Sequence, residues 1–227
     1  MFFYDWTYLL IIPGMLLGLW AQHKVKSAYA EYSRIPTRLG RPAASVVDDL
    51  LRRNGNSKVR IGRVSGELTD HYNPGNETLN LSDGVYGSAS IAALGIAAHE
   101  AGHAMQKHEN YAPLMLRTTI VPAVNICSSL STPLFFLGLI MAWEPLTTLG
   151  IILFAASTVF ALVTLPVEFN ASNRAVAMLT EGGYVTGEEE RGVRNVLTAA
   201  ALTYVAAAVT SMLSLLRLVL IARRRND

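Results

Sequence analysis

Two histidines and a glutamate near the middle of the chain have the types and spacing of a metal-dependent hydrolase. The segment reads His99-Glu100-Ala101-Gly102-His103. Because residues four apart in a helix lie one above the other on one face, His99 and His103 can bind the same metal ion. Glu100 lies beside them, placed to take a proton from a water molecule that the metal activates. This pattern is typical of a zinc hydrolase, most often a peptidase.

The residues before this motif predict that it lies well inside a helix. From Ser88 to Ala98 the chain is rich in alanine and contains no proline, so neither histidine is expected at a frayed helix end. The alternative is an amphipathic helix whose two histidines and glutamate only face water. A third metal ligand elsewhere in the chain would decide between them.

The best candidate for that third ligand is Glu168. Pro166, followed by a run of helix formers, predicts a helix that continues or restarts where an apolar segment ends, and such a helix can return to the first one. Three protein ligands would leave the fourth zinc position for water. Ser172, one turn further on, can hydrogen-bond a ligand from outside. The alternative is that Glu168 is an interfacial carboxylate paired with a base such as Arg174.

The group that would stabilise charge on the substrate carbonyl oxygen is not defined by the motif. His71, Tyr72 and Arg174 are candidates by residue type alone. His71 is also the best available fourth protein ligand, which a purely structural zinc site would require. The expected cofactor in either case is one Zn²⁺ per chain.

Composition indicates a membrane protein. The 227 residues are 51% hydrophobic and only 16% charged, which is too apolar for an ordinary soluble domain. The formal charge of +2 and the lack of any nucleic-acid-binding motif exclude a nucleic-acid partner. Cys127 is the single cysteine, so the chain can form neither an intramolecular disulfide nor a cysteine-rich metal cluster.

Four apolar segments are candidate membrane spans. The first, residues 8–20, has aromatic residues at both ends and no cleavage site, which indicates an uncleaved anchor rather than a signal peptide. Residues 119–142 and 146–165 are each about 20 residues long and are joined by a tight linker. The fourth segment, residues 199–221, contains Arg217 close enough to its end to reach the membrane surface.

Residues 23–117 form the main polar region. Residues 43–53 predict a short amphipathic helix. The apolar period then changes to two, and strands are expected at residues 59–64, 67–72 and 78–81, as a small β-hairpin or a three-stranded sheet directly before the metal helix. One of these strands could bind an extended substrate by β-augmentation, or the sheet could only pack against the helix.

The basic residues predict the orientation in the membrane. No Lys or Arg precedes the first apolar segment or lies in the linker at residues 142–146, whereas six lie between the first two segments near their ends: Lys24, Lys26, Arg34, Arg38, Arg41 and Arg117. The positive-inside rule therefore places the polar region in the cytoplasm, and the helix with Glu168 returns to that side. If residues 199–221 span, Arg223 to Arg225 end up outside, so a re-entrant or interfacial last segment stays open.

Several stretches together resemble the YugP-type neutral zinc metallopeptidases, a family of bacterial membrane proteins. They are GELTDHY (66–72), AAHEAGHA (97–104), YAPL (111–114), LPVEFNAS (165–172) and AAALTYVAA (199–207). The resemblance covers most of the chain and implies an integral-membrane, zinc-dependent peptidase. Residues 168–172 also resemble the Glu-xxx-Asp helix of the HtpX and CAAX-processing peptidases, in which the later carboxylate supports a zinc-binding histidine. Ser172 takes the place of that carboxylate here.

Other zinc-peptidase types fit poorly. The longer metzincin motif HExxHxxGxxH fails because Gln106 occupies its glycine position and Glu109 its third histidine position. An HExxH motif with a downstream glutamate is instead typical of gluzincin-like peptidases, with Glu100 as the catalytic base.

The predicted fold is a mainly α, polytopic membrane helical bundle of three to four spans with a zincin-like α+β catalytic region. The expected parts are an N-terminal anchor (1–22), a cytoplasmic catalytic region with the small β-sheet (23–117), a transmembrane hairpin (118–165), a helix with the third ligand and a surface turn (166–198), and a fourth apolar helix with a basic tail (199–227).

The predicted function is a zinc-dependent endopeptidase of the bacterial inner or plasma membrane, with its active site on the cytoplasmic side. The expected partners are the lipid bilayer and a peptide or protein substrate, with membrane proteins in quality control as candidates. The alternative is a catalytically inactive metal-binding membrane scaffold. Cleavage specificity and oligomeric state stay open.

Overall fold

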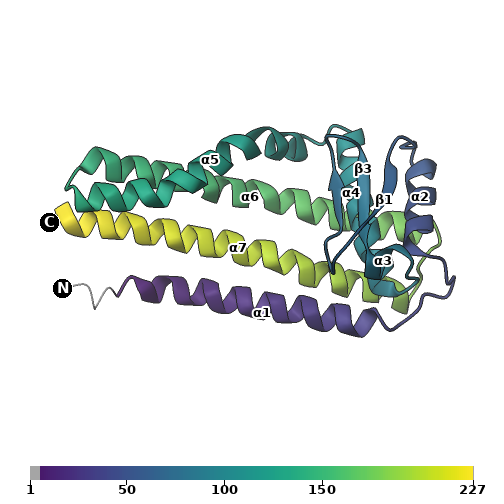
Figure 1. The fold of residues 1–227 in the computed structure, drawn as a ribbon. Helices are drawn as coiled ribbons and strands as arrows, with labels where there is room; N and C mark the ends of the chain where they lie inside the picture. The colour runs from purple at the N-terminus through teal and green to yellow at the C-terminus, as the bar shows by residue number, and fades with distance from the viewer. Residues whose placement is uncertain (1–5, 227) are drawn as a thin grey trace. The chain divides into compact units, whose positions relative to one another are not determined.

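The structure, a computed structural model, describes residues 6–226 (Figure 1). Within that range the chain forms seven helices and three strands: α1 (Tyr8–Tyr32), α2 (Ala43–Arg53), β1 (Arg60–Val64), β2 (His71–Asn73), β3 (Thr78–Ser82), α3 (Asp83–Tyr86), α4 (Ile91–His108), α5 (Ala112–Ile140), α6 (Glu144–Glu181) and α7 (Glu188–Asn226). The chain divides into two compact units. Of the described residues, the first contains 6–21, 116–165 and 203–226, and the second contains 22–115 and 166–202.

The small sheet of the second unit has the order β1-β3-β2. β3 pairs in parallel with β1, with Thr78 opposite Arg60, and antiparallel with β2, with Asn80 opposite His71. Of the two forms that the sequence predicts, a β-hairpin or a three-stranded sheet, the structure has the three-stranded sheet, but the strand predicted at residues 67–72 begins later. The backbone φ is +112° at Gly66 and +54° at Leu68, and because these values are incompatible with extended structure, β2 begins only at His71.

The core of the second unit lies between α2, the sheet and α4. The apolar face of α2 that the sequence predicts is fully buried, and it packs with β3, α4 and the end of α6, the largest buried side chains being Leu50, Leu51, Leu79, Leu81, Leu94 and Leu179. Ser90 caps α4, because its side-chain oxygen accepts a hydrogen bond from the N–H of Ala93. The helix therefore starts eight residues before His99 (99 − 91 = 8), and the motif lies inside it as expected.

The long helices begin earlier than their apolar segments. α5 starts at Ala112 instead of residue 119, and α7 at Glu188 instead of residue 199. Hydrophobicity marks the stretch that suits lipid, whereas helix-forming residues before it extend the helix beyond that stretch. α6 runs through Pro166 without a break, so Glu168 lies on the same helix as the third apolar segment.

Three helices, α5, α6 and α7, are long and apolar enough to cross a membrane among the described residues. Helix α1 is not one of them, and its role as an anchor stays a prediction. In the first unit α1 packs closely against α7, since a Cβ on Gly14 would lie 2.7 Å from Thr210 Oγ1. Small residues permit such close packing of apolar helices. The Arg217 guanidinium lies 3.9 Å from the ring centroid of Tyr8, which gives this arginine a partner on α1.

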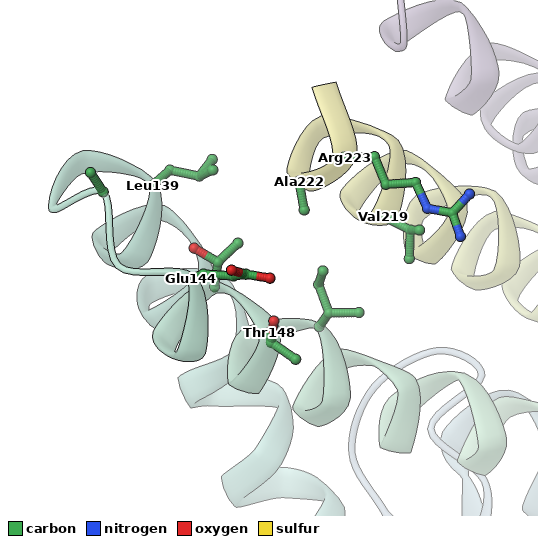
Figure 2. A pocket seen from close by; sticks show the side chains of 9 residues that line it. Leu139, Glu144, Thr148, Val219, Ala222 and Arg223 are labelled. Carbon is green, nitrogen blue, oxygen red and sulfur yellow. The ribbon is translucent and has the colours of Figure 1, made fainter. Parts of the chain in front are cut away.

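A cavity of about 410 Å³ lies in the first unit between the α5–α6 turn and the end of α7. Figure 2 shows Leu139, Glu144 and Thr148 on one side and residues of α7, including Arg223, on the other. The last apolar segment is thus part of the continuous helix α7 rather than a re-entrant segment, and the end of that helix lines the cavity beside the hairpin turn.

Candidate metal centre

Helix α4 and the part of α6 after residue 165 bring three candidate ligands together in the second unit. Glu168 Oε2 lies 3.2 Å from His99 Nε2 and 3.5 Å from His103 Nε2. The three ligand atoms all lie within 4.8 Å of one another. The side chain of Glu168 is only 2% exposed, whereas those of His99 and His103 are 14% and 12% exposed, so water can reach the histidines.

Two of the three distances between these atoms fit zinc. Bonds of about 2.0–2.1 Å arranged as a tetrahedron put neighbouring ligand atoms about 3.4 Å apart, close to the two measured N–O distances. Two imidazole nitrogens and one carboxylate oxygen are also the donor set of many catalytic zinc sites, with one position left for water. The residues present therefore fit a zinc ion.

Close packing of the two helices permits this arrangement. A Cβ on Gly102 would lie 2.5 Å from the carbonyl oxygen of Ala171, so only glycine allows the backbones of α4 and α6 to approach so closely. Gly102 precedes His103 in α4, and Ala171 lies between Glu168 and Ser172 in α6. The contact therefore keeps the candidate site residues of α4 close enough to those of α6 to share a metal ion.

The other ring nitrogen of each histidine also has a partner. Ser172 Oγ lies 3.2 Å from His99 Nδ1, the contact for which the sequence made Ser172 a candidate. Gln106 Oε1 lies 3.0 Å from His103 Nδ1. Partners of this kind orient a histidine and leave Nε2 directed at a metal. In the sequence Gln106 stands out only as a departure from the metzincin motif, although its position three residues after His103 on the same helix is a usable signal.

Gln106 is completely buried and belongs to a longer chain of hydrogen bonds. Its Nε2 donates to the carbonyl oxygen of Val167 at 2.8 Å and to Asn170 Oδ1 at 2.9 Å. Arg174 Nε donates to the same Asn170 oxygen at 2.7 Å, and the Arg174 guanidinium pairs with Glu109 at 2.7 Å. Arg174 is thus a member of the network behind His103, with Glu109 as its ionic partner.

Glu100, the candidate base, is held by the small sheet. Its Oε2 accepts a hydrogen bond of 2.8 Å from the backbone N–H of Tyr72 in β2. Burial, with a smaller contribution from Glu77, raises the pKa of the Tyr72 hydroxyl to about 12, so that hydroxyl stays protonated near neutral pH and can donate a hydrogen bond.

His71, by contrast, is engaged within the sheet. Its Nδ1 contacts the carbonyl oxygen of Thr69 at 2.9 Å and its Nε2 contacts Asn80 Nδ2 at 3.1 Å, and its side chain is exposed. Among the residues that the structure describes, His71 is not one of the group that could hold a metal ion, which consists of the two motif histidines and Glu168.

The electrostatics around His103 favour a bound cation. Burial by itself lowers the pKa of the His103 imidazole, but the hydrogen bond to Glu168 and the charges of Glu100 and Glu168 outweigh it, so the pKa is raised. Surroundings that stabilise an imidazolium in the metal-free protein can equally stabilise a metal dication.

Comparison with known proteins identifies the family. Residues 7–223 match the family described as "Putative neutral zinc metallopeptidase". The chain belongs to this family. The chain is also 46% identical over 218 residues to the "Putative membrane protease YugP" of Bacillus subtilis (strain 168), an alignment that covers 96% of this chain and 97% of that protein. No solved structure matches the chain. The family resemblance predicted from the sequence is thereby confirmed, and with it the membrane setting.

Proposed function

We propose that this chain is a membrane-bound, zinc-dependent endopeptidase in which His99, His103 and Glu168 hold one zinc ion and Glu100 is the general base. The observation that carries the proposal is the position of Glu168 Oε2, which lies within 3.5 Å of Nε2 of both histidines although the residues are more than 60 positions apart (168 − 103 = 65). The family match and the name of the B. subtilis relative support the same chemistry.

The side chains and the metal ion of the proposed site have separate roles in catalysis. Zinc bound at this site supplies a Lewis acid that polarises the scissile carbonyl and lowers the pKa of a water molecule. Glu100 accepts the proton of the attacking water and later delivers it to the leaving amine. The backbone N–H of Tyr72 holds one oxygen of Glu100, so the carboxylate enters the reaction already oriented. The Tyr72 hydroxyl and the Arg174 guanidinium are candidate donors to the substrate oxygen, and Arg174 is the weaker candidate because it is engaged with Asn170 and Glu109.

A peptide substrate fits the sheet beside Glu100. β2 is an edge strand, and the N–H of its central residue Tyr72 is directed at Glu100 rather than at β3. An extended peptide that lay along this edge, with the Tyr72 N–H left to Glu100, would run beside the proposed base. The three candidate spans support membrane proteins as the substrate class, and quality control is the proposed role.

We propose the cytoplasm as the side of the active site. The support is the set of lysines and arginines near the ends of the first two apolar segments, together with the lack of basic residues in the linker at 142–146.

The zinc content of the detergent-purified full chain tests the proposal. We expect about one zinc per wild-type chain and its loss or strong weakening in Glu168→Ala, because a two-histidine site lacks the third ligand. Zinc retained in Glu168→Ala would move the third ligand elsewhere. A wild-type protein that neither contains zinc nor binds it on reconstitution would favour the membrane scaffold.

A further inference from the structure

We propose that Gln106 is a positioning residue that fixes the tautomer of His103, so that the His103 Nε2 lone pair faces the metal position. The proposal rests on the zinc site proposed above, and it adds a group that neither the motif nor the family description assigns. It follows from the direction of each hydrogen bond in the buried chain that links His103 to Glu109 at the edge of the unit.

The side-chain amide of Gln106 can have only one orientation. Its Nε2 lies 2.8 Å from the backbone oxygen of Val167, which can only accept a hydrogen bond. The same nitrogen lies 2.9 Å from Asn170 Oδ1. A reversed amide would put the Gln106 oxygen against two acceptors and its NH₂ against His103. In the completely buried environment of Gln106, such unsatisfied contacts are costly.

The orientation of Asn170 is fixed in turn by Arg174. A guanidinium has hydrogen-bond donors and no acceptor, and Arg174 Nε lies 2.7 Å from Asn170 Oδ1. The Asn170 oxygen, not its NH₂, must therefore face both Arg174 and Gln106. Glu109 holds Arg174 with distances of 2.8 Å and 2.7 Å to its two terminal nitrogens. The polarity of the chain is thus set at both ends by groups that cannot be reversed, Arg174 and the Val167 carbonyl.

The fixed orientation of Gln106 determines which nitrogen of His103 carries the proton. Because Gln106 presents its carbonyl oxygen 3.0 Å from His103 Nδ1, that nitrogen must carry the proton. A neutral imidazole with hydrogen on Nδ1 has its lone pair on Nε2, the atom 3.5 Å from Glu168. The other histidine lacks such control, because its partner, the Ser172 hydroxyl, can donate or accept. Gln106 therefore fixes the tautomer of His103, whereas Ser172 can hydrogen-bond either tautomer of His99.

The test is zinc affinity, measured by competition with a chromophoric chelator on metal-stripped, detergent-solubilised full chain. In Gln106→Met, which keeps the length of the side chain without its polar atoms, we expect affinity to fall about 10- to 100-fold, the usual effect of removing an outer partner of a metal ligand. Ser172→Ala should cost less. Asn170→Asp should stay near wild type, because a carboxylate still accepts from both Gln106 and Arg174.

Nitrogen-15 NMR of the His103 ring provides a readout that a merely structural role would not change. At a pH above the folded-state pKa of the ring, where the metal-free imidazole is neutral, the wild type should carry the proton on Nδ1, and Gln106→Met should give a mixture of tautomers. If Gln106→Met does not fold, Asn170→Leu breaks the same chain without altering Gln106, and it should weaken zinc binding where Asn170→Asp does not.

The possible outcomes separate the two proposals. Loss of affinity in the Gln106 variant, with Asn170→Asp unaffected, would support the positioning role. Wild-type affinity and an unchanged tautomer in Gln106→Met would overturn it and leave the zinc site standing. A wild-type chain that binds no zinc would overturn the proposed function and this inference with it.

Discussion

The α-carbon of Gly102 faces the backbone of Ala171 so closely that a Cβ there would lie 2.5 Å from the Ala171 carbonyl oxygen. We expect Gly102→Ala to push α4 away from α6, to destabilise the protein by about 1–3 kcal/mol, as overpacking does, and to weaken zinc binding. Thermal unfolding and chelator competition would measure the two effects.

Gly95, two turns earlier on the same helix, is the matched control for Gly102. A Cβ there would meet Val193 Cγ1 at 3.4 Å, an ordinary contact distance. Since alanine is also the better helix former by about 1 kcal/mol, Gly95→Ala should be neutral or stabilising and should keep zinc. Equal behaviour of the two variants would show that the approach of the helices does not control the site.

Glu100→Gln tests the proposed division between metal binding and proton transfer. The glutamine should still accept the hydrogen bond from Tyr72 N–H, and it removes no proposed metal ligand, so zinc content should match wild type. Cleavage of a protein substrate should fall by at least about 10²- to 10⁴-fold, the usual contribution of general acid–base catalysis. Turnover near the wild-type rate would exclude Glu100 as the base, and lost zinc would show that the carboxylate has a structural part in the site.

The sequence predicts those parts of the protein that depend on local pattern. The helix with the HExxH motif, helix α2 and the downstream helix with Glu168 all appear, because apolar periodicity and helix-forming residues predict them, and Ser90 also caps α4. β2 was placed too early, because the left-handed backbone at Leu68, an unusual conformation for this residue type, has no clear sequence signal.

The hydrogen-bond network behind His103 could not be predicted in the same way. Gln106 and Asn170 are 64 residues apart (170 − 106), and their contact depends on how two packed helices are rotated about their axes. His71 illustrates the opposite case. Its residue type suited a ligand or an oxyanion donor, yet local bonds to Thr69 and Asn80 hold both ring nitrogens.

The raised pKa of His103 predicts opposite pH dependences for the metal-free and zinc-bound protein. In the metal-free protein the protonated ring is stabilised by Glu168 and Glu100, so this contribution is fully present below the unfolded-state pKa of about 6.5 and is lost as pH rises through the higher folded-state pKa. Zinc binding requires the neutral ring, so zinc affinity should fall as pH drops through that same folded-state pKa.

Thermal unfolding in detergent, with excess chelator or with excess zinc, would measure both trends between about pH 6 and pH 8. The metal-free protein should become less stable as pH rises, and the stabilisation added by zinc should grow. Glu168→Gln removes the largest cause of the raised pKa of His103 and should flatten the metal-free trend. A metal-free stability that increases with pH across this range would contradict the prediction.

The orientation in the membrane can be tested at two exposed positions. The hairpin turn and the end of α7 line one cavity, so Arg223 shares an end of the first unit with the linker that the positive-inside rule places outside. The basic residues near the first two apolar segments and those at the end of α7 therefore favour opposite orientations in the membrane. We expect the basic residues near the first two segments to set the orientation, because they are more numerous and because those segments are synthesised before α7. In a Cys127→Ser background, Met141→Cys should react with a membrane-impermeant maleimide in intact bacterial cells, and Lys58→Cys only after permeabilisation. The reverse pattern would put the active site outside the cell and exclude cytoplasmic segments of membrane proteins as substrates.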